Sequence, residues 1–396
     1  MANLINKVKK RGVSLKILFI SNYFNHHQKY LSDSLNGMCE QYYFVATSKM
    51  REERKKIGYG DISIPNYVVD VSGEDVDAKE LDQIKEGDVV ITGSAPEKYI
   101  AKHQKEKKLL FRYSERIYKE KYQWYKWPFR LITFYKKYTR HRNNYLLCSS
   151  AFTYADYAKH FSFINKAYKW GYFPETKKYS SIKSLMDNKK PSTILWCGRF
   201  MGWKHPDDVL SVAKRLKAEG YHFELNFIGT GEMETVLQER IVQNNLTDCV
   251  HLLGAMSPEG VRKHMEQSQI YLFTSDRREG WGAVLNEAMN SGCAVIASHA
   301  IGSVPFLLQN GENGLIYQSG NVEMLYKKVK FLMENNDEAQ RLGKNAYATI
   351  VNEWNAEEAA RRFMALSEHI LAGEKYPDLY KSGPCSKAKI VKDNWF

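Results

Sequence analysis

The chain has 396 residues, of which 43% are hydrophobic and 26% are charged. Its 58 Lys and Arg outnumber its 45 Asp and Glu, which gives a net charge of +13. This composition is typical of a folded globular protein and excludes a disordered chain, a collagen and a coiled coil, and the length predicts two domains. No apolar run approaches the ~18–20 residues of a membrane-spanning helix, so we do not expect the chain to be an integral membrane protein.

The start of the chain and its cysteines favour a cytoplasmic protein. The basic residues before Leu15 precede an apolar run that is short, contains Lys16 and has no small-residue cleavage site, so we expect no signal peptide. The six cysteines are irregularly spaced and form no CxxC pair. We therefore expect neither a disulfide framework nor a zinc site, as suits a reducing compartment.

A first domain is predicted over residues 1–174, where short apolar runs alternate with longer amphipathic segments, as in a parallel sheet covered by helices. The expected strands are Leu15–Ser21, Tyr42–Thr47, Tyr67–Val71, Asp88–Thr92, Leu109–Tyr113, Tyr145–Cys148 and Ala167–Gly171. The expected helices are Gln28–Met38, Glu97–Lys107 and Ala151–Phe161.

A polar segment at 175–191 predicts a linker, and the same alternation restarts in a second domain at 192–368. Its expected strands are Thr193–Cys197, Glu224–Ile228, Val250–Leu253, Ile270–Thr274, Ala294–Ala297 and Leu315–Tyr317. Its expected helices are Asp207–Ala218, Glu232–Gln243, Pro258–Glu266, Ala283–Asn290, Val322–Asn335 and Glu357–Leu371. The tail at 369–396 is expected to pack back on the first domain.

These patterns predict an α/β fold of two Rossmann-like, doubly wound domains that face each other across a cleft. Such sheets bind ligands outside the carboxyl ends of their strands, so the site is expected in that cleft. No repeat with a period of 20–50 residues is present in the sequence, which excludes a solenoid.

The strongest motif, EGWGAVLNEAM, directly follows a predicted strand and carries two carboxylates. Glu279 falls in a loop and Glu287 on the next helix. The amides of Gly282, Ala283 and Val284 at that helix start would form a phosphate site. An ionised carboxylate only accepts hydrogen bonds, so the pair suits the hydroxyls of a ribose or a hexose. The alternative is a surface acid and a helix salt-bridge partner.

The loop after the first strand of this domain supplies cations. Gly198 allows the loop to approach a ligand, and Arg199 and Lys204 would neutralise the charge of a departing diphosphate. The alternative is that both cations are solvated. Two weaker signals are the GTG turn in Ile228–Glu232, which lacks the third glycine of a dinucleotide fingerprint, and the turn at His251–Met256, where a base could lie.

A GR…K loop, a GxGE turn, an EGWGxxxxEAM block and an NGENGL ending follow one another in this domain. With these blocks, residues 192–368 resemble the retaining nucleotide-sugar glycosyltransferases of family 4, which have the GT-B fold. The resemblance implies hexose transfer from a nucleoside-diphosphate sugar, with a UDP-sugar favoured, to a glycan acceptor. It implies no cofactor and no metal.

The resemblance also implies roles for individual residues. Arg199 and Lys204 would bind the diphosphate, Glu287 the ribose hydroxyls and Glu279 the hydroxyls of the transferred sugar. The expected catalytic residues are Glu279, Arg199 and Lys204. The expected donor-binding residues are Gly198, Arg199, Lys204, Met256, Glu279, Gly282, Ala283, Val284 and Glu287. No carboxylate is placed to form a covalent intermediate with the sugar. We therefore expect the acceptor to attack the anomeric carbon on the same face as the leaving diphosphate, which assists the attack.

The first domain departs from the family pattern. It has no glycine-rich loop after the first strand, and His26 and His27 occupy that position. We predict that one of them contacts the acceptor or the donor phosphate. The alternative is that both are surface histidines at a helix start. Arg112–Arg116 occupies the region where many relatives carry a histidine. Val304–Phe306 stands where relatives commonly have an acidic residue after the proline. Asp75-Val-Asp77 spells a metal-binding DxD, but we reject that role because it lies far from any nucleotide signal.

The charge excess is concentrated at 101–145, which holds fourteen Lys and Arg, three Glu and twelve aromatic residues. Cations alternating with rings suit an anionic membrane surface or single-stranded nucleic acid, and a charged face over an aromatic core is the third interpretation. We favour the membrane and expect a peripheral protein at the inner face, with a lipid-linked acceptor in surface polysaccharide assembly.

Two other functions remain open at this point. A sugar-nucleotide epimerase with a comparable two-lobed fold would convert the donor in the absence of an acceptor. A nucleic-acid-binding protein would use the 101–145 segment alone and would ignore nucleotide sugars.

Overall fold

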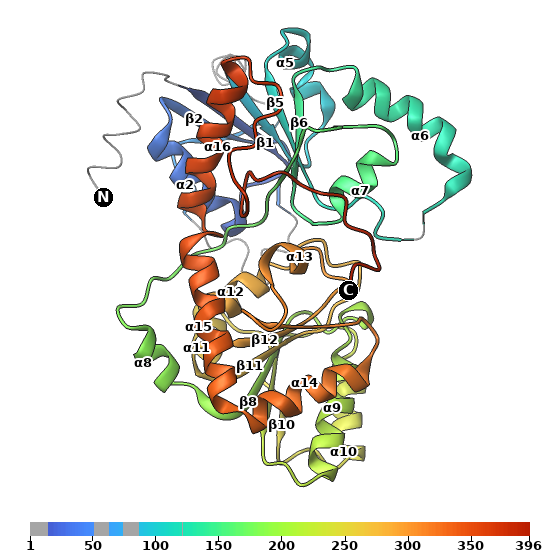
Figure 1. The fold of residues 1–396 in the computed structure, drawn as a ribbon, viewed down its shortest axis with the longest axis vertical. Coiled ribbons are helices and arrows are strands. Elements are labelled where there is room, and N and C mark those ends of the chain that lie inside the picture. Colours follow the sequence, from blue (N-terminus) through green and yellow to red (C-terminus); the bar gives the residue numbers. More distant parts are fainter. Residues whose placement is uncertain (1–14, 51–62, 74–86, 121) are drawn as a thin grey trace. The chain divides into compact units, whose positions relative to one another are not determined.

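A computed structural model describes residues 15–50, 63–73, 87–120 and 122–396. The chain forms two compact units, each built on its own parallel sheet (Figure 1). The first unit comprises the chain up to Pro174 together with Asn355–Lys392, and the second comprises Glu175–Trp354 with Asp393–Phe396. Within the described ranges, no helix is long and apolar enough to cross a membrane.

The sheet of the first unit has, among the described residues, seven parallel strands in the order β3-β2-β1-β4-β5-β6-β7. The strands are β1 (Lys16–Ser21), β2 (Gln41–Ala46), β3 (Val68–Asp70), β4 (Val89–Thr92), β5 (Leu109–Ser114), β6 (Asn144–Cys148) and β7 (Ala167–Lys169). The helices are α2 (His26–Met38), α5 (Ala101–Lys105), α6 (Trp127–Phe134), α7 (Thr153–Ala158) and α16 (Ala356–Leu371). Single turns lie at Glu97–Tyr99, Trp124–Lys126 and, as π-helix, Tyr135–Thr139.

The second unit repeats this design with a sheet ordered β10-β9-β8-β11-β12-β13. Its strands are β8 (Lys190–Cys197), β9 (Glu224–Ile228), β10 (Val250–Leu252), β11 (Ser268–Phe273), β12 (Ala294–Ser298) and β13 (Leu315–Tyr317). Its helices are α8 (Ile182–Asp187), α9 (Pro206–Ala218), α10 (Glu234–Gln243), α11 (Pro258–Gln267), α12 (Val284–Asn290), α13 (Val304–Leu307), α14 (Val322–Glu334) and α15 (Asn336–Asn352). A 3-10 turn lies at Gly202–Lys204.

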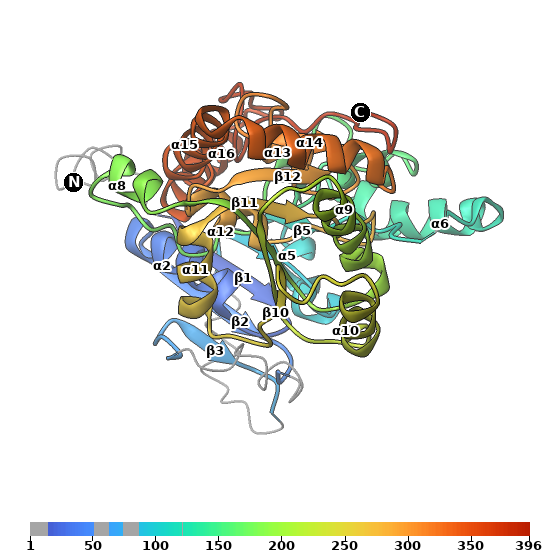
Figure 2. The ribbon, with the colours of Figure 1, turned by 90° about the horizontal axis from the view of Figure 1, so that it is seen from below.

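Burial explains why these strands form. The central strands β1 and β11 are almost wholly buried because helices cover both faces of a parallel sheet, and their sequences are correspondingly apolar. Figure 2 shows α14 and α15 lying over β12 of the second unit, and both helices contact that strand. Helix starts are fixed by side chains such as Asn355, whose Oδ1 accepts the Glu358 amide of α16 at 2.9 Å.

The strand order places a topological switch point in each sheet. The order reverses between β1 and β4 in the first unit and between β8 and β11 in the second. Loops that leave neighbouring strands in opposite directions create a crevice at the carboxyl edge, where doubly wound sheets bind ligands. In the second unit, the loops concerned are those that follow β8 and β11, which carry the predicted cations and Glu279.

The structure corrects the expected linker at 175–191. This segment groups with the second unit, contains α8 and leads directly into β8, which begins at Lys190. Ser181 caps α8 by accepting the Ser184 amide, and Leu185 and Met186 are buried. The segment is polar because α8 is exposed on its other side, which made it resemble a linker.

The boundary expected at 368 also differs from the structure. Helix α16, assigned to the second domain by its position in the chain, groups with the first unit, where Phe363 packs against Phe111 of β5 with ring centroids 4.8 Å apart. The following residues bond to the edge strand β7, with the Ala388 amide donating to the Ala167 carbonyl at 3.0 Å. Residues 369–392 thus group with the first unit, whereas 393–396 group with the second.

Candidate functional site

Three loops meet at the carboxyl edge of the second sheet. The Gly198 amide donates to the Ile228 carbonyl at 3.0 Å, and the Gly229 amide donates to the Gly254 carbonyl at 2.8 Å, so the ends of β8, β9 and β10 are joined. Gly229 has a φ of +133°, and a Cβ there would lie 2.0 Å from the Gly198 oxygen. Only glycine permits this approach.

An ion pair links the loops after β8 and β11 across the switch point. Lys204 Nζ lies 2.5 Å from Glu279 Oε2, and the two side chains are only 12% and 14% exposed. The hydroxyl of Ser275 donates to the same Glu279 oxygen at 3.0 Å, and the hydroxyl of Thr274 donates to the Lys204 carbonyl at 2.6 Å. The stem of Lys204 crosses Gly198, whose Cβ would lie 3.4 Å from the Lys204 Cδ.

The turn before α12 requires glycine. Gly282 has a φ of +78°, and a Cβ there would lie 2.3 Å from Phe273 Cζ and 3.2 Å from Glu279 Cγ. The turn therefore holds the Glu279 side chain close to the helix start. Within the described part of the chain, the amides of Gly282, Ala283 and Val284 donate no backbone hydrogen bond. Such amides can donate hydrogen bonds to an anionic ligand.

Glu287 lies on α12, one helical turn after this start. Its carboxylate makes no hydrogen bond or ion pair with any residue that the structure describes. Burial raises the pKa of Glu287 to about 7, an effect that the charge of Arg262 partly offsets and that of Glu175 reinforces. A poorly solvated carboxylate without a partner gains stability from a ligand that donates hydroxyl hydrogens.

The other predicted donor residues occupy the same edge but are less enclosed. Arg199 is exposed, and its guanidinium forms no hydrogen bond or ion pair within the described residues. Met256 is half-buried in the loop between β10 and α11. The structure therefore brings Gly198, Lys204, Glu279 and Gly282 into contact, with the other predicted donor residues around them. Their individual roles stay predictions.

His26 and His27 begin α2 of the first unit, directly after β1 and its switch point. Asn25 caps the helix by accepting the His27 amide at 2.8 Å. The two imidazole rings are 4.0 Å apart, and His27 stacks on Tyr172 at 5.5 Å. Tyr172 in turn donates to Glu115 Oε1 at 2.6 Å. Contact of either histidine with an acceptor or a phosphate stays a prediction.

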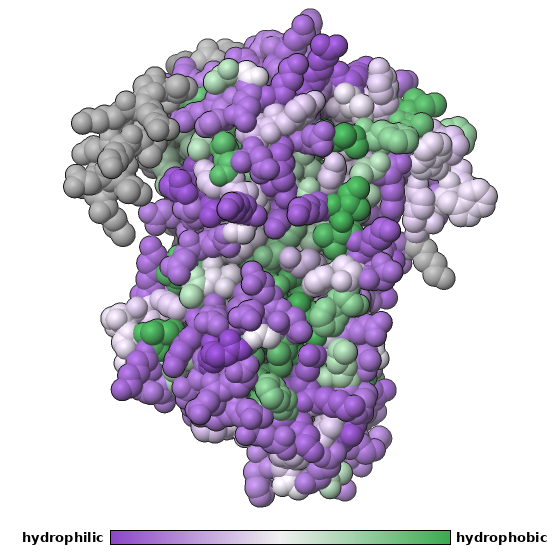
Figure 3. All heavy atoms as spheres, viewed as in Figure 1, coloured by the Kyte–Doolittle hydropathy of each residue, from purple (hydrophilic) through white to green (hydrophobic). Residues whose placement is uncertain are grey.

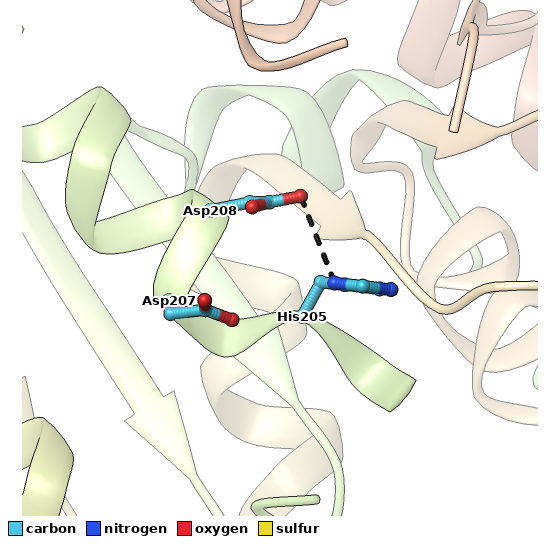
Figure 4. A group of neighbouring side chains, drawn as sticks. All are labelled: His205, Asp207 and Asp208. Atoms are coloured by element: carbon cyan, nitrogen blue, oxygen red, sulfur yellow. Dashed lines mark ion pairs between the residues drawn. The ribbon is translucent and has the colours of Figure 1, made fainter. Parts of the chain in front are cut away.

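Figure 4 shows the His205, Asp207 and Asp208 side chains, whose nitrogen and oxygen atoms could together hold a metal ion. Both aspartates lie in the first turn of α9, where a carboxylate stabilises the helix dipole. His205 Nε2 also lies 3.8 Å from Asp276 Oδ2. The cluster is thus explained without a ligand. The DxD at Asp75 and Asp77 lies outside the described residues.

Sequence reasoning missed the residues that anchor the Glu279 loop. Trp281 is fully buried and donates from Nε1 to Asn286 Oδ1 at 2.9 Å. Its ring lies near those of Phe306 and Trp354, and these two stack at 6.0 Å. Phe306 therefore completes an aromatic cluster with Trp281 and Trp354. The tryptophan between two glycines was the available signal for such an anchor.

Comparison with known proteins finds similar glycosyltransferases. The model for Glycosyl transferases group 1 matches residues 178–349. An amylovoran biosynthesis glycosyltransferase from Erwinia amylovora is 26% identical over 186 residues, which is 46% of either chain. A UDP-N-acetylglucosamine–peptide N-acetylglucosaminyltransferase subunit from Streptococcus pneumoniae is 27% identical over 41% of this chain and 33% of its own. The chain spans about half the length of the curated relatives it matches.

Solved structures resemble nearly the whole chain. Anabaena HepE, crystallised with UDP and glucose, has a TM-score of 0.63 at 14% identity and covers 91% of this chain and all of its own (100%). Sucrose-phosphate synthase from Thermosynechococcus elongatus has a TM-score of 0.64 at 13% identity over 90% of this chain and 99% of its own.

Two parallel Rossmann-like sheets with these neighbours define the GT-B fold class, as the sequence predicted. Through residues 178–349, the chain is similar to the Glycosyl transferases group 1 family.

Proposed function

We propose that this chain is a retaining glycosyltransferase that moves a hexose from a UDP-sugar to a glycan acceptor. The observation that carries the proposal is the Lys204–Glu279 pair at the switch point of the second sheet, with Glu287 on the adjoining helix. It combines a cation for the diphosphate with two carboxylates for hydroxyls, in a domain of the group 1 family.

The proposed chemistry follows from these groups. When the donor binds, its diphosphate competes with Glu279 for Lys204, and the released carboxylate can accept hydrogen bonds from the hexose. Arg199, Lys204 and the amides before α12 then stabilise the negative charge that develops on the leaving diphosphate. We propose that these cations and amides suffice without a divalent metal, so that transfer continues in EDTA.

The choice of UDP rests on neighbours of the fold. HepE was crystallised with UDP and with UDP-glucose, and TarM with UDP. The amylovoran and capsular polysaccharide transferases among the relatives support a role in surface polysaccharide assembly. We propose a lipid-linked glycan as the acceptor and a cytoplasmic enzyme at the inner membrane face.

A thermal-shift panel of UDP, GDP, ADP and CDP in EDTA tests the donor site. We expect UDP alone to raise the melting temperature, because a ligand at about 100 times its Kd stabilises by about 2.7 kcal/mol. Stabilisation by no nucleotide would overturn the proposal. A nucleotide that binds only with manganese would overturn the metal-free chemistry. In a separate activity assay, conversion of the UDP-sugar in the absence of an acceptor would favour the epimerase.

An exposed arm in the first unit supports the membrane location. The aromatic arm, residues 122–140, includes α6, which projects away from the sheet of its own unit (Figures 1 and 2). Its most exposed apolar side chains are Trp124 (77%), Tyr125 (59%), Phe129 (76%), Ile132 (56%) and Tyr135 (57%). In Figure 3, green and pale residues gather at the upper right, where Figure 1 places α6.

Charge makes an anionic lipid surface the favoured partner of this arm. Residues 122–142 contain six Lys and Arg and no acidic residue. Phe134 fixes the base of the arm by packing on His160 with centroids 4.3 Å apart, and Trp127 Nε1 donates to the Lys159 carbonyl at 3.0 Å. A rigid base that presents rings and cations outward suits the headgroup region, where Trp and Tyr are stable and each cation contributes about 1 kcal/mol.

Replacement of Phe129 by Glu is expected to weaken vesicle binding at least tenfold, because burying a large apolar side chain contributes about 1.5–3 kcal/mol. The measurement is co-sedimentation with phosphatidylglycerol and with phosphatidylcholine vesicles at low and high salt. Phe331→Glu on α14, which is 43% exposed, is the matched control and should bind as wild type. Equal loss in both variants would contradict the arm's role. Salt-sensitive RNA binding without vesicle binding would favour the nucleic-acid alternative.

A further inference from the structure

The last residues of the chain lie against two loops of the candidate donor site. Trp395 Nε1 donates to the His299 carbonyl at 3.0 Å. The Phe396 ring lies 6.3 Å from the His299 ring. Asp393 Oδ2 lies 3.3 Å from Arg277 NH2. These contacts lie within the second unit, to which Asp393–Phe396 belongs.

The two contacted loops hold Glu279 from both sides. Arg277 stands two residues before Glu279 in the loop after β11, and the Glu279 amide donates to the Asp276 carbonyl at 3.1 Å. His299 begins the loop after β12, and three residues later the Gly302 amide donates to the Glu279 carbonyl at 3.2 Å. A shift in either loop therefore moves the Glu279 backbone.

His299 is a firm point of attachment. It is only 8% exposed, its amide donates to the Tyr317 carbonyl at 2.9 Å, and its Nδ1 accepts the Ser319 amide at 3.0 Å. The contact between Asp393 and Arg277 is a solvated surface pair and contributes little. The hydrogen bond of Trp395, together with the hydrogen bond between the His299 side chain and the Asp393 backbone, thus links residues 393–396 to the loop after β12.

We propose that Trp395 is a positioning residue of the donor site, which fixes the loop after β12 and thereby the orientation of Glu279. The proposal rests on the proposed function, because it assigns Glu279 to the hexose. Trp395 would not touch the donor. It would hold the loops in the arrangement in which the Glu279 carboxylate meets Lys204 and the sugar hydroxyls.

A double-mutant cycle tests this link. Trp395→Phe keeps an aromatic side chain and removes the N–H donor, and is expected to lower kcat/KM for the UDP-sugar about fivefold, the effect of one neutral hydrogen bond. In a Glu279→Gln background the same change should have almost no effect, because the residue through which Trp395 acts is already altered. Asn394→Ala, an exposed neighbour in the same segment, is the control and should match wild type.

Hydrogen exchange supplies a readout that needs no activity. Trp395→Phe is expected to speed exchange of the Gly302 amide several-fold, while Asn394→Ala leaves it unchanged. Additive effects in the cycle, or unchanged exchange at Gly302, would overturn the positioning role. Wild-type protein that neither binds UDP nor transfers sugar would instead overturn the proposed function, and the exchange measurement would still decide whether Trp395 holds the loop.

Discussion

Replacement of Glu287 by Gln is expected to abolish transfer and, at the same time, to stabilise the unliganded protein. The carboxylate is assigned two hydroxyl hydrogen bonds of the donor ribose. Loss of two charge-assisted bonds lowers kcat/KM by about 10²–10⁴-fold. In the unliganded protein the same carboxylate has no partner that the structure describes and is poorly solvated. Removing its charge should therefore relieve a cost of folding.

The stabilisation depends on pH in a defined direction. The folded pKa of Glu287, about 7, lies above the ordinary value of 4.5, so folding favours the protonated form. Wild-type stability therefore falls as pH rises from 4.5 to 7, and the loss is complete above that range. We expect Glu287→Gln to match wild type at pH 5 and to exceed it at pH 8 by about 1–3 kcal/mol, measured by urea unfolding.

UDP binding should change with pH in the opposite sense. The ionised carboxylate is the form that accepts hydroxyl hydrogens, so calorimetric affinity is expected to increase as pH rises through 7 in wild type and to stay flat in Glu287→Gln. Glu239→Gln on α10, an exposed glutamate of the same unit, controls for the general effect of removing a charge. A destabilised Glu287→Gln protein with normal turnover would contradict both the burial and the site assignment.

The strands could be predicted because strands buried in a parallel sheet have almost uninterrupted apolar sequences. The expected bounds of β9 and β13 are those of the structure, and the others differ by a few residues at their ends. Helix α15 was missed because its buried positions include Ala339, Gly343 and Ala346, which give little hydropathy contrast. A Cβ at Gly343 would lie 2.3 Å from the Gly292 carbonyl oxygen, so small residues are needed for that close approach.

The sequence pattern did not predict which elements pack against each other. The amphipathic spacing of α16 predicts a covered face but does not say which sheet covers it, and Phe363 meets Phe111 of the first unit. Likewise, the motifs around Lys204 and Glu279 were recognisable, whereas their contact follows from the adjacency of β8 and β11, strands more than seventy residues apart in the chain. The sequence of 101–145 also does not show that Phe134 is buried against His160 while most of the neighbouring aromatic residues are exposed.

Replacement of Lys204 by Met is expected to lower kcat by about 10²–10³-fold, the effect of removing one group that stabilises developing charge in an enclosed site. Lys204 is only 12% exposed and is positioned by its carbonyl contact with Thr274, so its charge acts where water screens it little. Arg199→Met should cost only about tenfold, because the exposed guanidinium is screened by solvent. Steady-state kinetics with the UDP-sugar separate the two expectations.

The ion pair between Lys204 and Glu279 means that the effects of replacing the two residues should be coupled. Lys204→Met leaves Glu279 without its cation, so part of the loss reflects a carboxylate that the diphosphate then repels. The double variant Lys204→Met/Glu279→Gln is therefore expected to lose less activity than the product of the single losses. Unchanged melting temperatures would show that the fold is intact. Strict multiplicativity would mean that the two side chains act independently, and wild-type turnover of Lys204→Met would remove the diphosphate role from this loop.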